Sequence, residues 1–151
     1  DRRQRRHRFA TRHRMGSGTV ILLDTHVLVW LDEGSDKLGK QARHAIERAF
    51  EDDALAACAI SFWELAMLQQ RGRIELPPLG PWREELLDMG LCEIAVDGKI
   101  GLAAAGLQGF HSDPADRLIV ATAMARDATL VTADTRILDW QAELARVDAK
   151  S

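Results

Sequence analysis

Four carboxylates carry the chemistry that this sequence suggests. They are Asp24, Glu64, Asp116 and Asp134, and each lies where a short apolar run gives way to a helix-like segment. In an open α/β sheet with parallel strands, such junctions lie together at the carboxyl edge of the sheet. Side chains that are far apart in sequence can therefore meet in one cleft, and we expect these four to form a single site.

A cluster of carboxylates needs a positive charge beside it. Two carboxylates about 4 Å apart repel each other by about 4 kcal/mol at an effective dielectric constant near 20, and their pKa values rise unless a cation neutralises them. Oxygen ligands favour Mg²⁺ or Mn²⁺. The two cysteines, Cys58 and Cys92, have no His or Cys neighbours at the spacing of zinc sites. The pattern predicts Mg²⁺ or Mn²⁺, with open positions for a phosphodiester oxygen and an attacking water.

Each acid also has an ordinary structural explanation. Ser61 and Glu64 fit the capping box of one helix. Asp113, which precedes a proline, fits the N-cap of another helix and would place Asp116 in its first turn, where the helix dipole favours a negative charge. Asp134 also fits an N-cap. Capping is the better explanation for any one of them, whereas their common position at strand ends favours a shared site.

The elements that must position these acids alternate between strand and helix. Short apolar runs predict buried strands at residues 20–23, 54–60 and 129–132, alternation of apolar and polar residues predicts a strand at 91–96, and a last edge strand is expected at 144–147. Amphipathic spacing and capping signals predict helices at 26–31, 38–51, 61–70, 82–89, 97–107, 114–126 and 134–140, with residues 71–82 forming a loop rich in Pro and Gly. The order predicts an α/β fold with a mainly parallel sheet covered by helices on both faces.

Length and composition indicate a soluble globular protein. The chain has 151 residues, of which 46% are hydrophobic and 28% charged, and such a length buries one sizeable core but does not suffice for two ordinary domains. Since no apolar run approaches the ~18 residues that span a bilayer, we expect no membrane segment. We expect one domain over residues 15–151.

Charge is unevenly distributed along the chain. Residues 1–14 hold seven of the twenty basic residues and one of the twenty-three acids, which leaves residues 15–151 with a formal charge of minus nine. We expect residues 1–14 to be a disordered Arg-rich extension, because they contain too little apolar surface to fold alone. Two other interpretations stay open. One is that the extension comes from an upstream translation start, since Met15 is an ordinary first residue of a protein. The other is that the extension binds nucleic acid without specificity.

At its acidic positions the sequence resembles the PIN-domain nucleases, and more narrowly the VapC-type toxins of bacterial toxin–antitoxin pairs. The matching segments follow the family's order: LLDTHVLVWL, ISFWELAML, HSDPADRLIVATAMARDATLVTAD and DTRILDW. The resemblance implies a PIN-like three-layer fold, a ribonuclease that depends on Mg²⁺ or Mn²⁺, a homodimer and a location in the bacterial cytoplasm. It also implies a small cognate antitoxin, which we expect to lay a helix or strand into a groove near the site.

The resemblance also assigns the site residues. Asp24, Glu64, Asp116 and Asp134 match the catalytic, metal-binding acids, and Asp113 matches an extra acid of the subgroup with a His-x-Asp-Pro-x-Asp-Arg block. We hypothesise that the first three bind one ion directly, while Asp134 completes the site or holds a second ion. A metal-activated water would then attack an RNA phosphodiester in line. The implied substrate is structured RNA, either tRNA or a loop of ribosomal RNA.

Five other residues are candidates for supporting roles. Thr25 and Thr132 can hydrogen-bond the carboxylates or their waters, although turn and capping roles suit Thr equally well. Arg117 can contact a phosphate or an antitoxin group, or form an ion pair within its own chain. Because residues 15–151 are acidic, RNA binding would rely on the ion and on local cations in the dimer groove, including Arg71, Arg73 and Arg117.

Histidine and aromatic residues near these motifs have simpler expected roles. We do not expect His26 or His111 to be ligands, because an all-oxygen Mg²⁺ site has little use for imidazole, and we expect His26 to be packed. Trp30, Phe62 and Trp63 occur at helical spacing. Such residues favour roles in the core or at a dimer contact over stacking with RNA bases.

Three alternative functions fit parts of the pattern. A phosphatase of the haloacid-dehalogenase type also has an Asp after its first strand, but it requires a second Asp where His26 stands. A signalling receiver domain, which is a phospho-acceptor module, requires an acidic pair where Leu23 and Asp24 stand. A PIN module that only binds RNA or a partner would gain nothing from clustered negative charges facing phosphate.

Overall fold

The computed structural model describes residues 18–151, so the expectations for residues 1–14 lie outside this part of the chain. Its strands form one sheet in the order β3-β2-β1-β4-β5, and all four neighbouring pairs are parallel. The strands are β1 (Ile21–Leu23), β2 (Leu55–Cys58), β3 (Cys92–Ile94), β4 (Thr129–Thr132) and β5 (Arg146–Asp148). The parallel sheet is confirmed, and β5 lies at its edge as predicted but begins two residues later.

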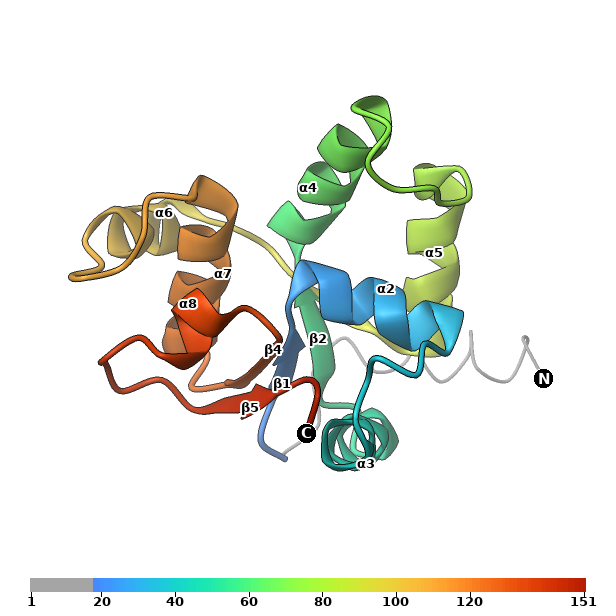
Figure 1. Cartoon of the computed structure of the whole chain (residues 1–151), viewed down its shortest axis with the longest axis horizontal. Coiled ribbons are helices and arrows are strands. Elements are labelled where there is room, and N and C mark those ends of the chain that lie inside the picture. The colour runs from blue at the N-terminus through green and yellow to red at the C-terminus, as the bar shows by residue number, and fades with distance from the viewer. Residues whose placement is uncertain (1–17) are drawn as a thin grey trace.

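Helices cover both faces of this sheet. They are α2 (Thr25–Glu33), α3 (Lys40–Glu51), α4 (Ala59–Gln70), α5 (Leu79–Met89), α6 (Gly98–Ala105), α7 (Pro114–Ala125) and α8 (Thr135–Leu138). Figure 1 shows α6, α7 and α8 on one side of the strands and α2, α3 and α5 on the other. This is the three-layer α/β architecture that the alternation of elements predicts. None of the helices in residues 18–151 is both long and apolar enough to cross a bilayer.

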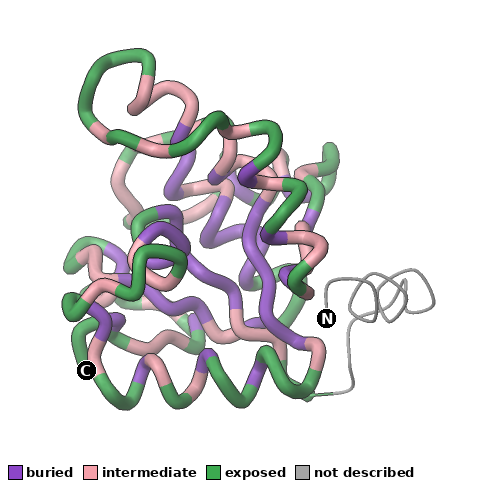
Figure 2. Tube along the Cα trace, turned by 90° about the vertical axis from the view of Figure 1, so that its right-hand side faces the viewer, coloured by how far each residue is buried: buried purple, intermediate pink, exposed green. Residues whose placement is uncertain are grey.

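The hydrophobic core lies on both faces of the sheet because successive strand residues point to opposite faces. Leu23 and Val131 pack with α2, α3 and α5, whereas Leu22 and Leu130 pack with α7 and α8. All four side chains are completely buried. A strand that is buried on both faces needs a continuous apolar run, which is the pattern that marks these segments in the sequence. Figure 2 shows buried chain running through the middle of the molecule, with the outer turns of the helices exposed.

Two helices begin earlier than the sequence predicts. Strand β2 ends at Cys58 and α4 starts at Ala59, because an apolar run alone does not distinguish a buried strand from a buried helix start. Ser61 therefore lies inside the helix, and its predicted capping box with Glu64 is wrong. Helix α5 starts at Leu79 within the predicted loop. Its first turn accommodates proline because N–H groups there have no partner inside the helix.

Candidate metal centre

The predicted acids meet in one pocket at the carboxyl edge of the sheet. The pocket has a volume of about 480 Å³. Its lining includes all four predicted carboxylates together with the extra acid: Asp24, Glu64, Asp113, Asp116 and Asp134. Residues far apart in sequence converge here because β1, β2 and β4 are parallel neighbours, so their ends and the helix starts that follow lie side by side.

Asp24 is the most firmly held of these acids. It ends β1, forms the N-cap of α2 and is 7% exposed. Its Oδ1 accepts a hydrogen bond of 2.8 Å from the backbone N–H of Thr25, and its Oδ2 accepts one of 2.6 Å from the Thr132 hydroxyl. Burial raises the pKa of Asp24, and the bonds from Thr132 and Thr25 partly offset that rise. Thr132 thus hydrogen-bonds a site carboxylate, as the sequence suggests.

Glu64 reaches the pocket from α4, and a buried pair of hydroxyls attaches that helix to α2. The Thr25 hydroxyl donates a hydrogen bond of 2.9 Å to the Ser61 hydroxyl, and both residues are completely buried. Burial raises the pKa of Glu64, and the negative charge of Asp24 raises it further. Sequence reasoning gave Ser61 a capping role. Its actual role is to fix the helix that carries Glu64.

Asp113 and Asp116 lie at the start of α7. Asp113 is the N-cap, as predicted, and its Oδ1 accepts a hydrogen bond of 3.1 Å from the backbone N–H of Asp116. Asp116 is 8% exposed. Burial raises its pKa to about 8, with further increments from the charges of Asp24, Asp113, Asp134 and Glu64. A carboxyl group of this kind is costly to ionise without a cation beside it.

Asp134 carries its own counter-charge. It is the N-cap of α8, as predicted. The Arg136 Nη2 lies 3.0 Å from Asp134 Oδ2 and 3.4 Å from Asp116 Oδ2, although the Arg136 side chain is 59% exposed. Burial raises the pKa of Asp134, but hydrogen bonds from the side chain and backbone of Arg136 outweigh it and lower the pKa overall. Sequence reasoning missed Arg136, although its position two residues after an N-cap acid favours such a contact.

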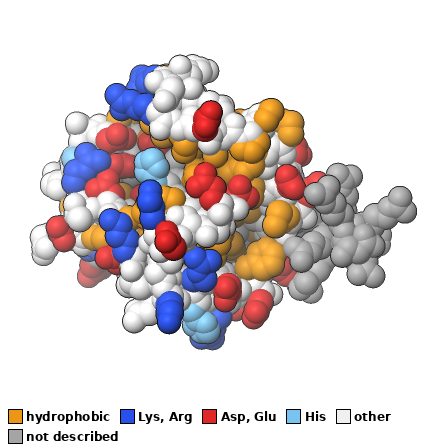
Figure 3. All heavy atoms as spheres, turned by 45° about the vertical axis from the view of Figure 1, so that its right-hand side comes forward, with side chains coloured by type: hydrophobic (Ala, Val, Ile, Leu, Met, Phe, Trp, Pro, Cys, Tyr) orange, Lys and Arg blue, Asp and Glu red, His pale blue; other side chains and the backbone are white. Residues whose placement is uncertain are grey.

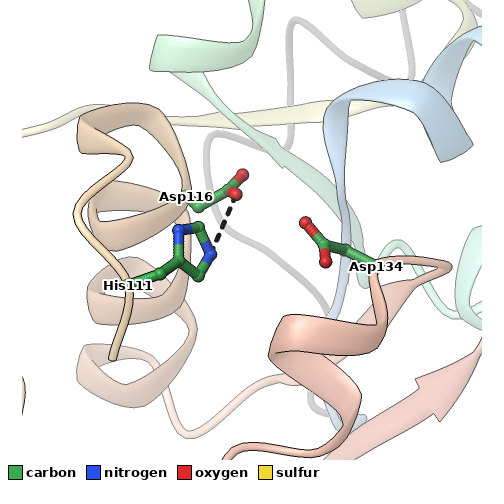
Figure 4. A group of neighbouring side chains, drawn as sticks. All are labelled: His111, Asp116 and Asp134. Atoms are coloured by element: carbon green, nitrogen blue, oxygen red, sulfur yellow. Dashed lines mark ion pairs between the residues drawn. The ribbon is translucent and has the colours of Figure 1, made fainter. Parts of the chain in front are cut away.

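His111 lies against the carboxylates, which the sequence did not indicate. Its Nε2 is 3.2 Å from Asp116 Oδ2, and Figure 4 shows the ring turned toward Asp116 with Asp134 across the pocket. Within residues 18–151, the buried Nε2 has no hydrogen-bond partner with good geometry. Nδ1 accepts a bond of 3.4 Å from the backbone N–H of Asp113, and the ring packs on Phe110 at a centroid distance of 4.4 Å.

The arrangement of ligand atoms fits a divalent cation. Two groups have ligand atoms within 4.8 Å of one another: Glu64 with Asp113 and Asp116, and His111 with Asp116 and Asp134. Asp116 belongs to both groups, and its carboxylate shares the pocket with four other acids, an arrangement that a divalent cation would neutralise. Asp24 lines the same pocket but belongs to neither group. His111 is therefore better placed to approach an ion than the sequence suggested.

Arg117 has a structural role that differs from both of its predicted roles. Its guanidinium donates to the backbone carbonyls of five residues, at 2.9–3.2 Å: Ala104, Ala105, Leu107, Phe110 and His111. A guanidinium has five N–H donors, and here each one is used. The side chain thus joins the end of α6 and the following loop to α7. It has no donor left for a phosphate or an antitoxin group, and the expected contact is not supported.

The two predicted RNA-contact arginines near the end of α4 differ in position. Arg73 lines a second hollow of about 460 Å³ beside the acidic pocket, whereas Arg71 lines neither. His26 and Trp30 line both hollows. His26 is exposed rather than packed, so that expectation was wrong. Trp30 packs on the core, as expected, while part of it borders the two hollows.

Fold and site together define a three-layer α/β protein with a carboxylate centre at the carboxyl edge of its sheet. The family model of the PIN domain matches residues 21–143, and the chain belongs to the PIN domain family. It is 39% identical over 121 residues to Ribonuclease VapC22 of Mycobacterium tuberculosis, covering 79% of this chain and 90% of that protein. The resemblance to VapC-type PIN proteins is thereby confirmed, and the phosphatase and receiver alternatives lose their support.

Solved structures show the same fold. A toxin–antitoxin complex from Klebsiella pneumoniae aligns with a TM-score of 0.59 at 21% identity, covering 85% of this chain and 97% of that one. VapBC2 from Rickettsia felis, bound to a DNA fragment from its promoter, aligns with a TM-score of 0.61 at 20% identity, covering 85% and 98%. At these identities the likeness establishes the fold, and the site must be argued from the side chains.

Proposed function

We propose that this chain is a VapC-type toxin, an endoribonuclease that depends on Mg²⁺ or Mn²⁺ and hydrolyses phosphodiester bonds in tRNA or in a loop of ribosomal RNA. The observation that carries the proposal is the convergence of five carboxylates in one pocket, with Asp116 at their centre. The similarity to a protein named a ribonuclease supports the reaction class. RNA can supply a phosphate oxygen to an ion held by such carboxylates.

Some residues of the pocket would bind the ion directly, and others position the residues that bind it. Asp116 would bind the cation with Glu64 and Asp113, or with Asp134 and His111, whose ligand atoms lie within 4.8 Å of one another. A bound divalent cation supplies Lewis-acid stabilisation and a water of lowered pKa. Each oxygen of Asp24 accepts one hydrogen bond and keeps a lone pair for the ion or its waters. Asp24, Glu64, Asp116 and Asp134 remain our proposed catalytic acids.

We also propose that a small cognate antitoxin binds this protein and that the toxin forms a homodimer. The solved structures above are complexes of toxins with antitoxins, and this chain carries a separate apolar cleft suited to a partner. The cleft has a volume of about 380 Å³, lies between α2, α3 and α5, and has Phe50 and Met89 at its exposed rim. Figure 3 shows the matching patch of hydrophobic side chains. An apolar face of a helix or strand would fill it.

The function is tested by incubating the purified chain with total RNA, with and without Mg²⁺ or Mn²⁺. We expect discrete cleavage products that require the metal and that disappear in Asp24→Asn. Asp139→Asn is the matched control, because Asp139 is an exposed carboxylate that does not line the pocket. Release of phosphate from small esters with RNA left intact would contradict the proposal, as would cleavage that persists in Asp24→Asn.

A further inference from the structure

A second hollow adjoins the acidic pocket and shares part of its wall. This basic hollow, as we call it, has a volume of about 460 Å³ and lies between α2 and the segment that follows α4. It shares His26, Trp30 and Leu68 with the acidic pocket. The volume lies within the range of about 300–1,000 Å³ that is typical of small-ligand sites. A polymer held at the acids can therefore extend into it.

The charge changes sign between the two hollows. Besides His26, which lines both hollows, the acidic pocket is lined by five carboxylates and two basic side chains, Arg136 and Lys150. The basic hollow is lined by Lys37, Arg73 and a single acid, Glu33. Because residues 15–151 carry a formal charge of minus nine, a local excess of positive charge is a departure from the rest of the surface. A phosphate is repelled by the negative charge of most of the surface but is attracted to this hollow.

The two cations of the basic hollow are not neutralised by carboxylates. Within residues 18–151, neither Lys37 nor Arg73 has an ion pair, whereas Arg83 and Arg136 do. The Lys37 Nζ lies 5.7 Å from the centre of the Trp30 ring. By contrast, all five N–H groups of the Arg117 guanidinium donate to backbone carbonyls. Lys37 and Arg73 are thus available to a ligand, whereas Arg117 and Arg136 are already bound within the chain.

Trp30 supplies an aromatic surface beside these cations. It is half-buried, packs against the core and borders both hollows. Sequence reasoning gave it a packing role, and the structure adds its position at the junction. An aromatic ring next to Arg or Lys is the combination that proteins use to bind unpaired nucleotides, because every base has a face that can stack and every linkage carries a phosphate.

We propose that the basic hollow binds the unpaired nucleotide next to the scissile phosphate, with its base against Trp30 and its phosphate paired with Arg73 and Lys37. This inference rests on the proposed ribonuclease function and specifies how the substrate lies. It makes the cleaved segment of the RNA single-stranded, because a paired base cannot reach a tryptophan beside the hollow. An acidic protein segment would suit the same two cations but has no planar base to lie against the half-buried Trp30 ring.

The test measures binding separately from cleavage. A fluorescein-labelled, unstructured oligouridylate of twelve nucleotides is titrated with Asp24→Asn protein in Mg²⁺, and affinity is read from anisotropy at two salt concentrations. Adding Arg73→Gln or Trp30→Leu should each weaken binding about tenfold, and Arg73→Gln should reduce the salt dependence by about one ion. Trp30→Phe, which keeps an aromatic ring, should restore most of the affinity. Thermal melting verifies that every variant is folded.

The controls remove the same types of side chain elsewhere on the surface. Arg126→Gln removes an exposed arginine at the end of α7, and Trp63→Leu removes a 54% exposed tryptophan of α4; neither residue lines either hollow. Both should bind the oligonucleotide as the parent does. Equal affinities for Arg73→Gln and Arg126→Gln would overturn the inference. So would an Arg73→Gln effect seen with an oligoglutamate peptide and not with RNA, which would make the hollow a protein-docking site.

A cleavage assay separates this inference from the function on which it rests. In this assay every variant keeps Asp24, so that cleavage can occur. Arg73→Gln and Trp30→Leu should raise KM about tenfold and leave kcat close to that of the parent, since neither residue belongs to the two groups of ligand atoms that could hold an ion. Metal-dependent cleavage with an unchanged KM in both variants would refute the nucleotide site alone. Absence of RNA cleavage by the unaltered chain would refute the ribonuclease and this site together.

Discussion

Two buried carboxylates in the same pocket differ in their hydrogen-bond partners, although burial raises the pKa of both. Asp24 and Asp116 are similarly buried, at 7% and 8% exposed. Asp24 accepts short hydrogen bonds of 2.8 and 2.6 Å on its two oxygens. The closest contacts of Asp116 with basic side chains are longer, 3.2 Å to His111 and 3.4 Å to Arg136, and its pKa rises to about 8. The difference teaches that two carboxylates at equal depth can differ in support: Asp24 is held by short hydrogen bonds, whereas Asp116 has weaker contacts and belongs to both groups of ligand atoms that could hold an ion.

The largest effects on RNA cleavage should come from removing the carboxylate of Asp24 or that of Asp116. Asp116→Asn and Asp24→Asn should each reduce RNA cleavage by at least about 100-fold, the scale of losing a charge-stabilising group in an active site. Their stabilities in EDTA should diverge. Asp116→Asn should melt at a higher temperature than the parent because it removes a poorly compensated charge, whereas Asp24→Asn should melt lower because it disturbs two good hydrogen bonds. Thermal melts of the three proteins measure this.

A shift in the same direction for both variants would break the contrast between Asp24 and Asp116. Asp139→Asn serves as the control, since that exposed carboxylate lies outside the pocket and should change neither cleavage nor melting temperature.

A smaller loss, in metal affinity, should follow from removing the hydrogen bond that Thr132 donates to Asp24. Thr132→Val keeps the shape of a completely buried side chain but removes the hydroxyl that donates to Asp24 at 2.6 Å. Metal affinity should fall by about 10- to 100-fold, as is usual when an outer hydrogen bond to a metal ligand is lost, and calorimetric titration with Mn²⁺ measures it. Thr129→Val, in the same strand, is the matched control. Equal affinities in the two variants would show that Asp24 needs no such support.

The pH dependence of stability should reveal Asp116 when metal is removed. Its pKa in the folded chain is about 8, above the ordinary 3.8, so the folded state retains a proton that the unfolded state releases. The resulting stabilisation is fully present below about pH 4 and is lost as the pH rises toward and through 8. Denaturant unfolding in EDTA should therefore give a free energy that declines over this range, with a shallower decline in Asp116→Asn. Identical slopes would contradict the raised pKa.

The smallest expected effect concerns Arg136. Its exposed guanidinium lies beside Asp116 and Asp134 where it competes with a cation, and exposed ion pairs contribute only about 0–1 kcal/mol. Arg136→Gln should therefore bind Mn²⁺ a few-fold more tightly than the parent, measured by the same titration. Arg126→Gln changes an exposed arginine of α7's end and should have no effect. Weaker metal binding in Arg136→Gln would mean that Arg136 supports the site rather than competes for it.

The convergence of the acids was predictable from sequence because it depends on strand order and strand ends. Apolar runs locate β1 and β4, and parallel pairing brings Asp24 beside Thr132, so that Asp134, two residues further on, enters the same pocket. The N-caps at Asp113 and Asp134 were also predictable, since capping involves residues close in sequence. The support that Thr132 gives to Asp24 followed from the same strand geometry.

What the sequence could not provide are contacts that tertiary packing alone decides. The position of His111 against Asp116 depends on how the loop before α7 folds back, and that loop is fixed by the carbonyl contacts of Arg117. The early start of α4, which turns Ser61 inward to Thr25, depends on burial rather than on local signals. The single domain over residues 15–151 stays a proposal.

Titration of the metal-free protein with Mn²⁺ in a calorimeter tests the central claim most directly, because it asks whether the converging carboxylates bind a divalent cation at all. We predict saturable binding by the parent chain, retained in Asp139→Asn and lost in Asp116→Asn. Binding of equal affinity and stoichiometry in all three proteins would contradict the account, because Asp116 belongs to both groups of ligand atoms that could hold the ion.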